Sequence, residues 1–342
     1  MRVIKRSFKA RYLIWLVMLP LIAWALRDIP LLEVWETIKG LSWSQVAFLG
    51  FLNIVIVLLL SSRWWLLLRS QGYRLPYPSL VAYRLGAFGV SYFTPGPQFG
   101  GEPLQVYLTR NRHAVPGATA LAAVSLDKLL ELVANFTFLA LGAFIILQGR
   151  FFGSLLGFEA SMIAIGLLCL PVIYLLALWS GRGPLSWLME RTPLRYALLP
   201  RVQRVQKTIA PVETQAKLLL QKRPVTLIQA MLLSILIWTA LIAEFWLLLN
   251  FLGAGLTLAQ TIAVMTLVRL AFLSPTPAGL GALEASLVLA MGALGLNPAL
   301  GIGVSLLIRG RDVLFAGLGI LLGLHFYRMT ENRPATYVQA GD

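Results

Sequence analysis

The chain has 342 residues, of which 58% are hydrophobic and 13% are charged, so it is far more apolar than a soluble domain. This composition excludes a soluble globular protein and predicts an all-α polytopic membrane protein, because several apolar runs approach the roughly 20 residues of a helical span. The net charge of +15 would suit nucleic acid or an anionic membrane surface, and the hydropathy favours the membrane. We therefore expect no nucleic-acid partner.

The first half, residues 1–180, is expected to contain four full spans. They are the apolar runs at residues 12–26, 45–68, 118–147 and 161–179. Five basic residues precede the first run, which predicts a cytoplasmic N-terminus under the positive-inside rule. Arg63, near the end of the second run, is expected to extend its charge toward the membrane surface.

A proline- and glycine-rich stretch interrupts the apolar sequence between residues 79 and 110. The pieces before and after it, 79–93 and 101–110, would measure about 22 and 15 Å as helices, less than the hydrocarbon thickness of about 30 Å. Because basic residues flank both ends, we predict a re-entrant hairpin over 79–110 that enters and leaves by the cytoplasmic face. A single broken span is the alternative.

The middle of the chain, residues 181–223, is strongly basic and is predicted to be the largest cytoplasmic loop between the two halves. Part of it, residues 202–220, has the pattern of an amphipathic helix that could lie on anionic headgroups. The simpler alternative is a solvated loop whose charge only reflects topology.

The second half, residues 224–328, repeats the plan of the first. Spans at 225–252 and 299–326 flank a second predicted hairpin at 258–296, and a cytoplasmic tail follows at 329–342. The chain would thus be a single membrane domain, 1–342, with about six full spans and both termini in the cytoplasm.

The two hairpins are predicted to be an inverted-topology repeat. Pro275 lies 180 residues after Pro95, and Val124-Ser125-Leu126 recurs as Val304-Ser305-Leu306 at the same offset. Three full spans separate the hairpins, and an odd number reverses the orientation of the second copy. This arrangement is common in secondary transporters.

The breaks themselves are candidate substrate-binding elements. Proline ends a helix and glycine permits positive φ, and a helix that begins after a break presents unpaired amides suited to an anionic group. An ordinary kinked span without a ligand is the alternative. The candidate residues are Pro95, Pro97, Gly100, Gly101 and Glu102 in the first break and Pro275, Pro277, Gly279, Gly281 and Glu284 in the second.

Ionisable residues inside the apolar segments form a second group of candidates, because each is costly in a bilayer unless it is paired or wetted. Arg84 and Arg269 precede the two breaks and are expected to bind an anionic headgroup. The residues expected to form gating or cavity charge pairs are Asp127, Lys128, Glu131, Arg309, Arg311 and Asp312. Lys128 with Glu131, and Arg309 with Asp312, would lie on one helical face. Ion pairs that only set helix register are the alternative, and Glu244 is expected to be a structural or cavity residue.

Other chemistry has no motif in the sequence. It contains no G-x-x-x-x-G-K-[ST] phosphate loop, and the two histidines, His113 and His325, lie far apart with no metal-ligand spacing around them. We therefore expect no catalytic residue, no metal and no cofactor.

Together these motifs resemble a known family. Arg84 with the stretch from Phe93 to Pro103, the charged segment Ser125–Glu131, the stretch 274–284 and Leu306–Arg309 are similar to the transmembrane region of lysylphosphatidylglycerol synthases. In that family this region is regarded as a lipid flippase module. The full synthases add a soluble aminoacyl-transferase domain, and this chain ends 16 residues after Phe326, so the resemblance implies a stand-alone member without synthase activity.

The sequence therefore predicts a lipid flippase or translocase of the cell membrane. It would move an anionic or modified lipid, such as an aminoacyl-, glyco- or isoprenoid lipid, between leaflets by alternating access. The alternative is a membrane-embedded lipid-modifying transferase, or an accessory subunit of one, with Glu102, Asp127 or Glu284 as the base. Membrane lipids are the expected partners, with a lipid-modifying enzyme as a further candidate.

Overall fold

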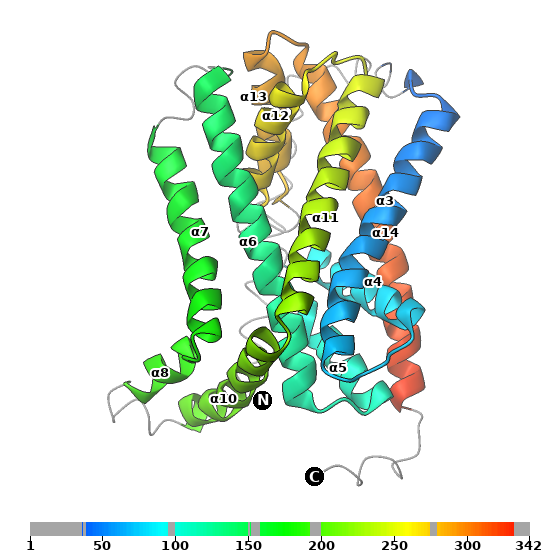
Figure 1. Cartoon of the computed structure of the whole chain (residues 1–342). Helices are drawn as coiled ribbons and strands as arrows, with labels where there is room; N and C mark the ends of the chain where they lie inside the picture. The colour runs from blue at the N-terminus through cyan, green and yellow to red at the C-terminus, as the bar shows by residue number, and fades with distance from the viewer. Residues whose placement is uncertain are drawn as a thin grey trace.

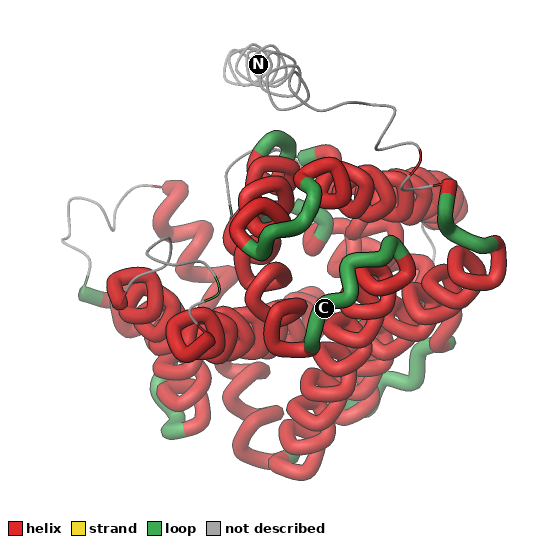
Figure 2. The backbone as a smooth tube through the Cα atoms, turned by 90° about the horizontal axis from the view of Figure 1, so that it is seen from above, coloured by secondary structure: helices red, strands yellow, loops and turns green. Residues whose placement is uncertain are grey.

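The structure, a computed structural model, describes residues 36, 39–94, 100–149, 151, 158–191, 200–273 and 279–331. All the regular structure in these ranges is helical, as Figure 2 shows in a view from above. The predicted span at 12–26, the tail beyond residue 331 and the prolines at 95, 97, 275 and 277 lie outside the described residues.

Five long helices form the body of the bundle (Figure 1). They are α3 (Trp43–Ser70), α6 (Gly117–Gly149), α7 (Phe158–Trp179), α11 (Pro224–Phe251) and α14 (Pro298–Glu331). Each one contains a run that the sequence predicts as a span. By length and composition, α3, α6 and α11 are long and apolar enough to cross a membrane. The all-α polytopic fold class is therefore confirmed.

Many large apolar side chains on the outside of the bundle are exposed. Ile235 on α11 is 64% exposed, and Leu314 and Leu321 on α14 are 75% and 68% exposed. A soluble protein rarely exposes so large an apolar surface, whereas lipid tails solvate one without cost. This surface indicates a protein that lies in a bilayer.

Two pairs of short helices insert between the long ones. The first pair is α4 (Tyr77–Phe93) and α5 (Glu102–His113), and the second is α12 (Leu258–Ala271) and α13 (Ala282–Ala293). They lie toward opposite ends of the bundle in Figure 1. Their re-entrant position in a bilayer stays a prediction.

The basic middle segment contains two helices, α8 (Pro184–Glu190) and α10 (Pro200–Lys222). The sequence predicts an amphipathic helix in the region of α10, whereas it does not predict α8. The buried carboxylate of Glu213 on α10 accepts hydrogen bonds from the Leu185 and Ser186 amides at 2.9 and 3.0 Å and from the Tyr174 hydroxyl at 2.9 Å. It thereby caps the first turn of α8 and joins α10 to α7.

The helix α14 contacts both short-helix pairs at very close range. A Cβ at Gly319 would overlap the Leu85 carbonyl oxygen on α4, and one at Gly301 would lie 2.8 Å from the Leu287 carbonyl oxygen on α13. Only glycine permits this approach of the two backbones, as in many packed membrane helices. The C-terminal half of α14 therefore packs on the pair α4–α5, and its N-terminal half packs on the pair α12–α13.

Substitution of Gly319 by alanine is predicted to lower stability. The added methyl group would overlap the Leu85 backbone and force the helices apart, at a cost of about 1–3 kcal/mol. Gly317→Ala is the matched control on the same helix, because no atom lies within 4 Å of a Cβ at Gly317. Thermal unfolding in detergent should show a lower midpoint for Gly319→Ala only, and equal midpoints for the two variants would contradict the close contact.

Candidate functional site

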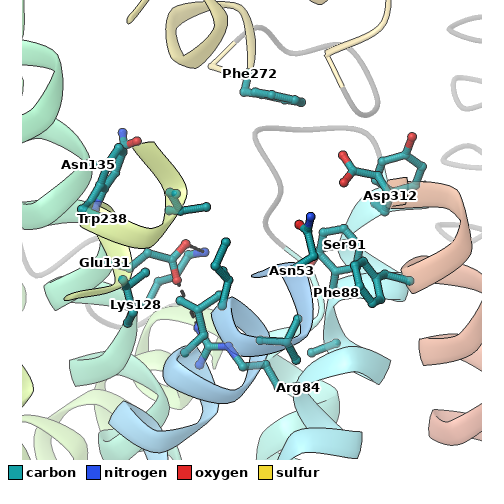
Figure 3. A pocket seen from close by; sticks show the side chains of 18 of the residues that line it. Asn53, Arg84, Phe88, Ser91, Lys128, Glu131, Asn135, Trp238, Phe272 and Asp312 are labelled. Atoms are coloured by element: carbon teal, nitrogen blue, oxygen red, sulfur yellow. Dashed lines mark hydrogen bonds and ion pairs between the residues drawn. The ribbon is translucent and has the colours of Figure 1, made fainter. Parts of the chain in front are cut away.

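A cavity of about 360 Å³ lies in the middle of the bundle, lined by side chains from α3, α4, α5, α6, α11, α12 and α14. Asn53 on α3 and Asp312 on α14 lie near the middle of their helices, whereas Arg63 lies seven residues before the end of α3 and Asp127 lies ten residues after the start of α6. Figure 3 shows Arg84, Lys128 and Glu131 close to one another, with Asn53 and Asp312 on another side of the cavity. The cavity thus extends from the middle of the long helices toward the end of the bundle where α3 ends and α6 begins.

Asp127 is the centre of the first charge cluster. Its Oδ1 accepts from Arg63 Nε and its Oδ2 from Arg84 Nη1, both at 2.7 Å. Arg63 also donates to the Asp127 backbone carbonyl and to Ser234 Oγ on α11. One carboxylate therefore connects α3, α4 and α6, and Arg63 adds α11 to the connection.

The expectation that Arg63 reaches the membrane surface is wrong. Its side chain is 1% exposed and points into the bundle, because Asp127 and Ser234 offer a charge and a hydroxyl there that bulk lipid cannot supply. Arg63 follows an unbroken run of apolar and small residues on α3 and lies seven residues before the end of that helix. That position is the sequence signal that could have identified it as an interior charge.

Lys128 and Glu131 form the predicted ion pair one helical turn apart, with Nζ and Oε1 separated by 2.9 Å. Lys128 Nζ also lies 3.5 Å from Glu102 Oε1 at the start of α5, and Glu131 Oε2 lies 3.6 Å from Arg84 Nη2. These contacts bind the first short-helix pair to α6. Arg84, predicted to bind a ligand, is consequently engaged by two carboxylates.

A second cluster surrounds Arg311 on α14. Its Nη1 lies 3.0 Å from Glu244 Oε1 on α11, and its Nε lies 2.9 Å from Asp312 Oδ1. Asn53 Nδ2 on α3 donates to the same Glu244 oxygen at 3.1 Å. This confirms that Glu244 is a cavity residue, and it adds Asn53, which the sequence analysis missed because an asparagine in an apolar run carries no charge signal.

Arg309 pairs with Glu284 on α13, so the predicted pair of Arg309 with Asp312 is wrong. Arg309 Nη2 lies 2.9 Å from Glu284 Oε2, Arg309 Nε donates to Oε1, and Ser305 Oγ donates to Oε1 at 2.9 Å. Glu284 at the start of α13 faces α14 and receives two guanidinium bonds in a bidentate arrangement, which a residue on the same helix cannot match. This pair joins the second short-helix pair to α14.

The glycines at the breaks hold the chain in turns rather than open to the cavity. Gly100, Gly279 and Gly281 have φ of 142°, 65° and 80°, values that favour glycine. The Gly101 amide donates to Ser91 Oγ at 2.9 Å, and the Gly281 amide donates to Glu284 Oε2 at 2.8 Å. Contrary to the sequence-based expectation, these two amides are therefore occupied by protein groups.

Eight predicted residues line the cavity and six described ones do not. The lining residues are Arg84, Glu102, Asp127, Lys128, Glu131, Arg269, Arg311 and Asp312. The others are not among the lining residues and form turns or contacts at the starts of α5 and α13: Gly100, Gly101, Gly279, Gly281, Glu284 and Arg309. Within the described ranges no group of three or more His, Cys, Asp or Glu could hold a metal ion.

The fold and the site define a class of protein: a helical membrane protein with a charged cavity in its middle. Residues 12–319 match the family described as Lysylphosphatidylglycerol synthase TM region, and the chain belongs to this family. It is also similar to UPF0104 membrane proteins of Methanocaldococcus jannaschii and Pyrococcus horikoshii. Each is 23% identical to it, over 75% of this chain and 77% of the relative for the first, and over 80% and 85% for the second. A further relative from Methanothermobacter thermautotrophicus is 21% identical over 78% of this chain and 80% of its own length.

Asp127→Asn is predicted to be among the most destabilising conservative substitutions in the chain. It would leave the buried Arg63 guanidinium without its main counter-charge, at a cost of about 3–5 kcal/mol. Glu131→Gln is the matched control, because the Glu131 side chain is 38% exposed and its loss leaves no fully buried cation unpaired. Thermal unfolding in detergent should rank Asp127→Asn well below Glu131→Gln, and the reverse order would contradict the central role of Asp127.

Proposed function

We propose that the protein is a lipid translocase that moves the polar headgroup of a lipid between leaflets through the central cavity. The observation that carries this proposal is the position of the charged cavity inside the bundle, where it extends from the middle of the long helices toward one end and is in contact with both short-helix pairs. A headgroup that crosses a bilayer needs polar partners at the depth where lipid tails offer none. The cavity supplies these partners, and the apolar exterior leaves the acyl chains in lipid.

Alternating access would follow from the way the short-helix pairs are attached. The pair α12–α13 is held to α14 by the bidentate contact of Glu284 with Arg309. The pair α4–α5 is held to α6 by Arg84 with Asp127 at 2.7 Å and by Glu102 with Lys128 at 3.5 Å. We infer that these two attachments tighten and loosen in turn, so that each pair closes one end of the cavity. The glycine contacts of α14 with α4 would transmit the movement between the ends.

A lipid-modifying transferase is the competing function, with Glu102, Asp127 or Glu284 as a general base. Each of these carboxylates lies within 4 Å of a lysine or arginine in the described part of the chain. Such pairing stabilises the ionised carboxylate and makes it a weak base. This favours transport, and a separate lipid-modifying enzyme as a partner stays compatible with it.

The basic helix ends also suggest an orientation. Arg69, Arg110, Lys222 and Arg328 lie in the last turns of α3, α5, α10 and α14, which share the lower end of the bundle in Figure 1. Under the positive-inside rule this end would face the cytoplasm. We therefore propose a protein of the cytoplasmic membrane with both termini in the cytoplasm.

Translocation can be tested in proteoliposomes with fluorescent NBD-phosphatidylglycerol and dithionite, which quenches only the outer leaflet. Wild-type protein is expected to raise the accessible fraction above one half. Leu241→Trp, on the cavity wall of α11, should remove most of this activity by filling the cavity. Ile235→Trp, on the exposed side of the same helix, should preserve it. No transfer by wild type of NBD-labelled phospho- or glycolipids, or full transfer by Leu241→Trp, would count against the proposal.

The orientation can be tested with alkaline phosphatase, which is active only outside the cytoplasm. A fusion after Gly72, between α3 and α4, is expected to be inactive, and a fusion after Gly253, between α11 and α12, is expected to be active. The opposite result at either position would exclude the proposed topology.

A further inference from the structure

Arg269 on α12 differs from the other cations of the cavity in having no carboxylate partner among the described residues. Arg63, Arg84, Lys128 and Arg311 each lie within 4 Å of at least one carboxylate oxygen. Arg269 lines the same cavity, and its guanidinium makes a cation–π contact with an aromatic ring instead. The two arginines that the sequence treats as equivalent, Arg84 and Arg269, are therefore in different electrostatic situations.

An aromatic platform holds the Arg269 guanidinium. Its Cζ lies 4.9 Å from the ring centroid of Trp238 on α11, and Trp238 stacks on Phe138 of α6 with centroids 4.4 Å apart and planes at 20°. A cation–π contact covers one face of the guanidinium and leaves its N–H groups at the edge available. Three helices thus orient a donor group beside the cavity without neutralising it.

The charges on the cavity wall explain why a ligand is expected at this point. The wall carries five cations and five carboxylates, so it is neutral as a whole. Arg311 contacts two carboxylates, Glu244 and Asp312, and Arg269 is left as the cation of the wall with no carboxylate within 4 Å among the described residues. An ionised group without a partner in a low-dielectric interior is costly, and a bound anion at Arg269 would remove that cost.

We propose that Arg269, seated on Trp238, binds the phosphate group of the transported lipid headgroup, whereas Arg84 is a positioning residue held by Asp127 and Glu131. This inference rests on the proposed function and names the chemical class of its substrate as a phosphate-bearing lipid. The guanidinium fork matches two phosphate oxygens at once. Trp238 contributes by fixing the plane of that fork.

The proposal can be tested by binding, without transport. Isothermal titration calorimetry on the purified full chain in detergent would compare three probes. Dihexanoyl-phosphatidylglycerol carries phosphate and acyl chains, dihexanoylglycerol lacks the phosphate, and glycerol 3-phosphate lacks the acyl chains. Wild type is expected to bind the first and neither of the others comparably.

Arg269→Gln should weaken binding of dihexanoyl-phosphatidylglycerol by about 10- to 100-fold, the range for loss of a charged hydrogen-bonded partner. Arg269→Lys keeps the charge and loses the fork, so a smaller loss is expected, and it serves as the second variant should Arg269→Gln fold poorly. Arg191→Gln is the matched control, because Arg191 makes the same kind of contact with Trp187, at 4.2 Å, outside the cavity. It should bind like wild type.

Unchanged affinity of both Arg269 variants would overturn the proposal, as would equal binding of dihexanoylglycerol by wild type. Binding of glycerol 3-phosphate as tight as that of the lipid would overturn the assignment to a lipid and indicate a soluble phosphate ligand. These results are separable from the transport assay. Wild type that binds the phospholipid through Arg269 and moves no lipid contradicts the translocase alone, whereas transport with Arg269-independent binding contradicts the phosphate site alone.

Discussion

The structure depends on the requirement that ionised groups in the interior of the bundle have partners, which the cavity cations other than Arg269 meet with carboxylates among the described residues. Asp127 meets this requirement for two arginines at once, each at 2.7 Å, and in doing so joins α3, α4 and α6. Glu244 pairs with Arg311 and joins α11 to α14, and Glu284 pairs with Arg309 and joins α13 to α14. In a protein without a strong hydrophobic force between its helices, such pairs and close backbone contacts determine which helices are neighbours.

Close packing at glycines complements these ion pairs and gives α14 a central role. The helix approaches α4 at Gly319 and α13 at Gly301, and its Arg309 pairs with Glu284 on α13. Elements that contact through backbone atoms move as a unit more readily than elements that contact through long side chains. The geometry therefore suits a coupled movement of the two short-helix pairs, as the proposed alternating access requires.

The balance of charges on the cavity wall affects which ligands the cavity can bind. A wall with equal numbers of cations and carboxylates is not a general trap for anions, since four of the five cations are already engaged. Selectivity would then come from the position of Arg269 beside Trp238 and not from net charge. The neutral cavity wall thus differs from the chain as a whole, which has a net charge of +15.

The sequence by itself determined the local structure. Apolar run length set the long helices, and proline and glycine at 94–102 and 274–281 ended the short ones, because these signals act within a few residues. Only the tertiary structure decided the partners of the charges. In the structure, Arg63 points into the bundle and Arg309 pairs with Glu284 rather than with Asp312. Arg269 has no carboxylate partner among the described residues. The physical reason is that an ion pair depends on which helices are adjacent and how they are rotated, and residue spacing along one helix does not contain that information.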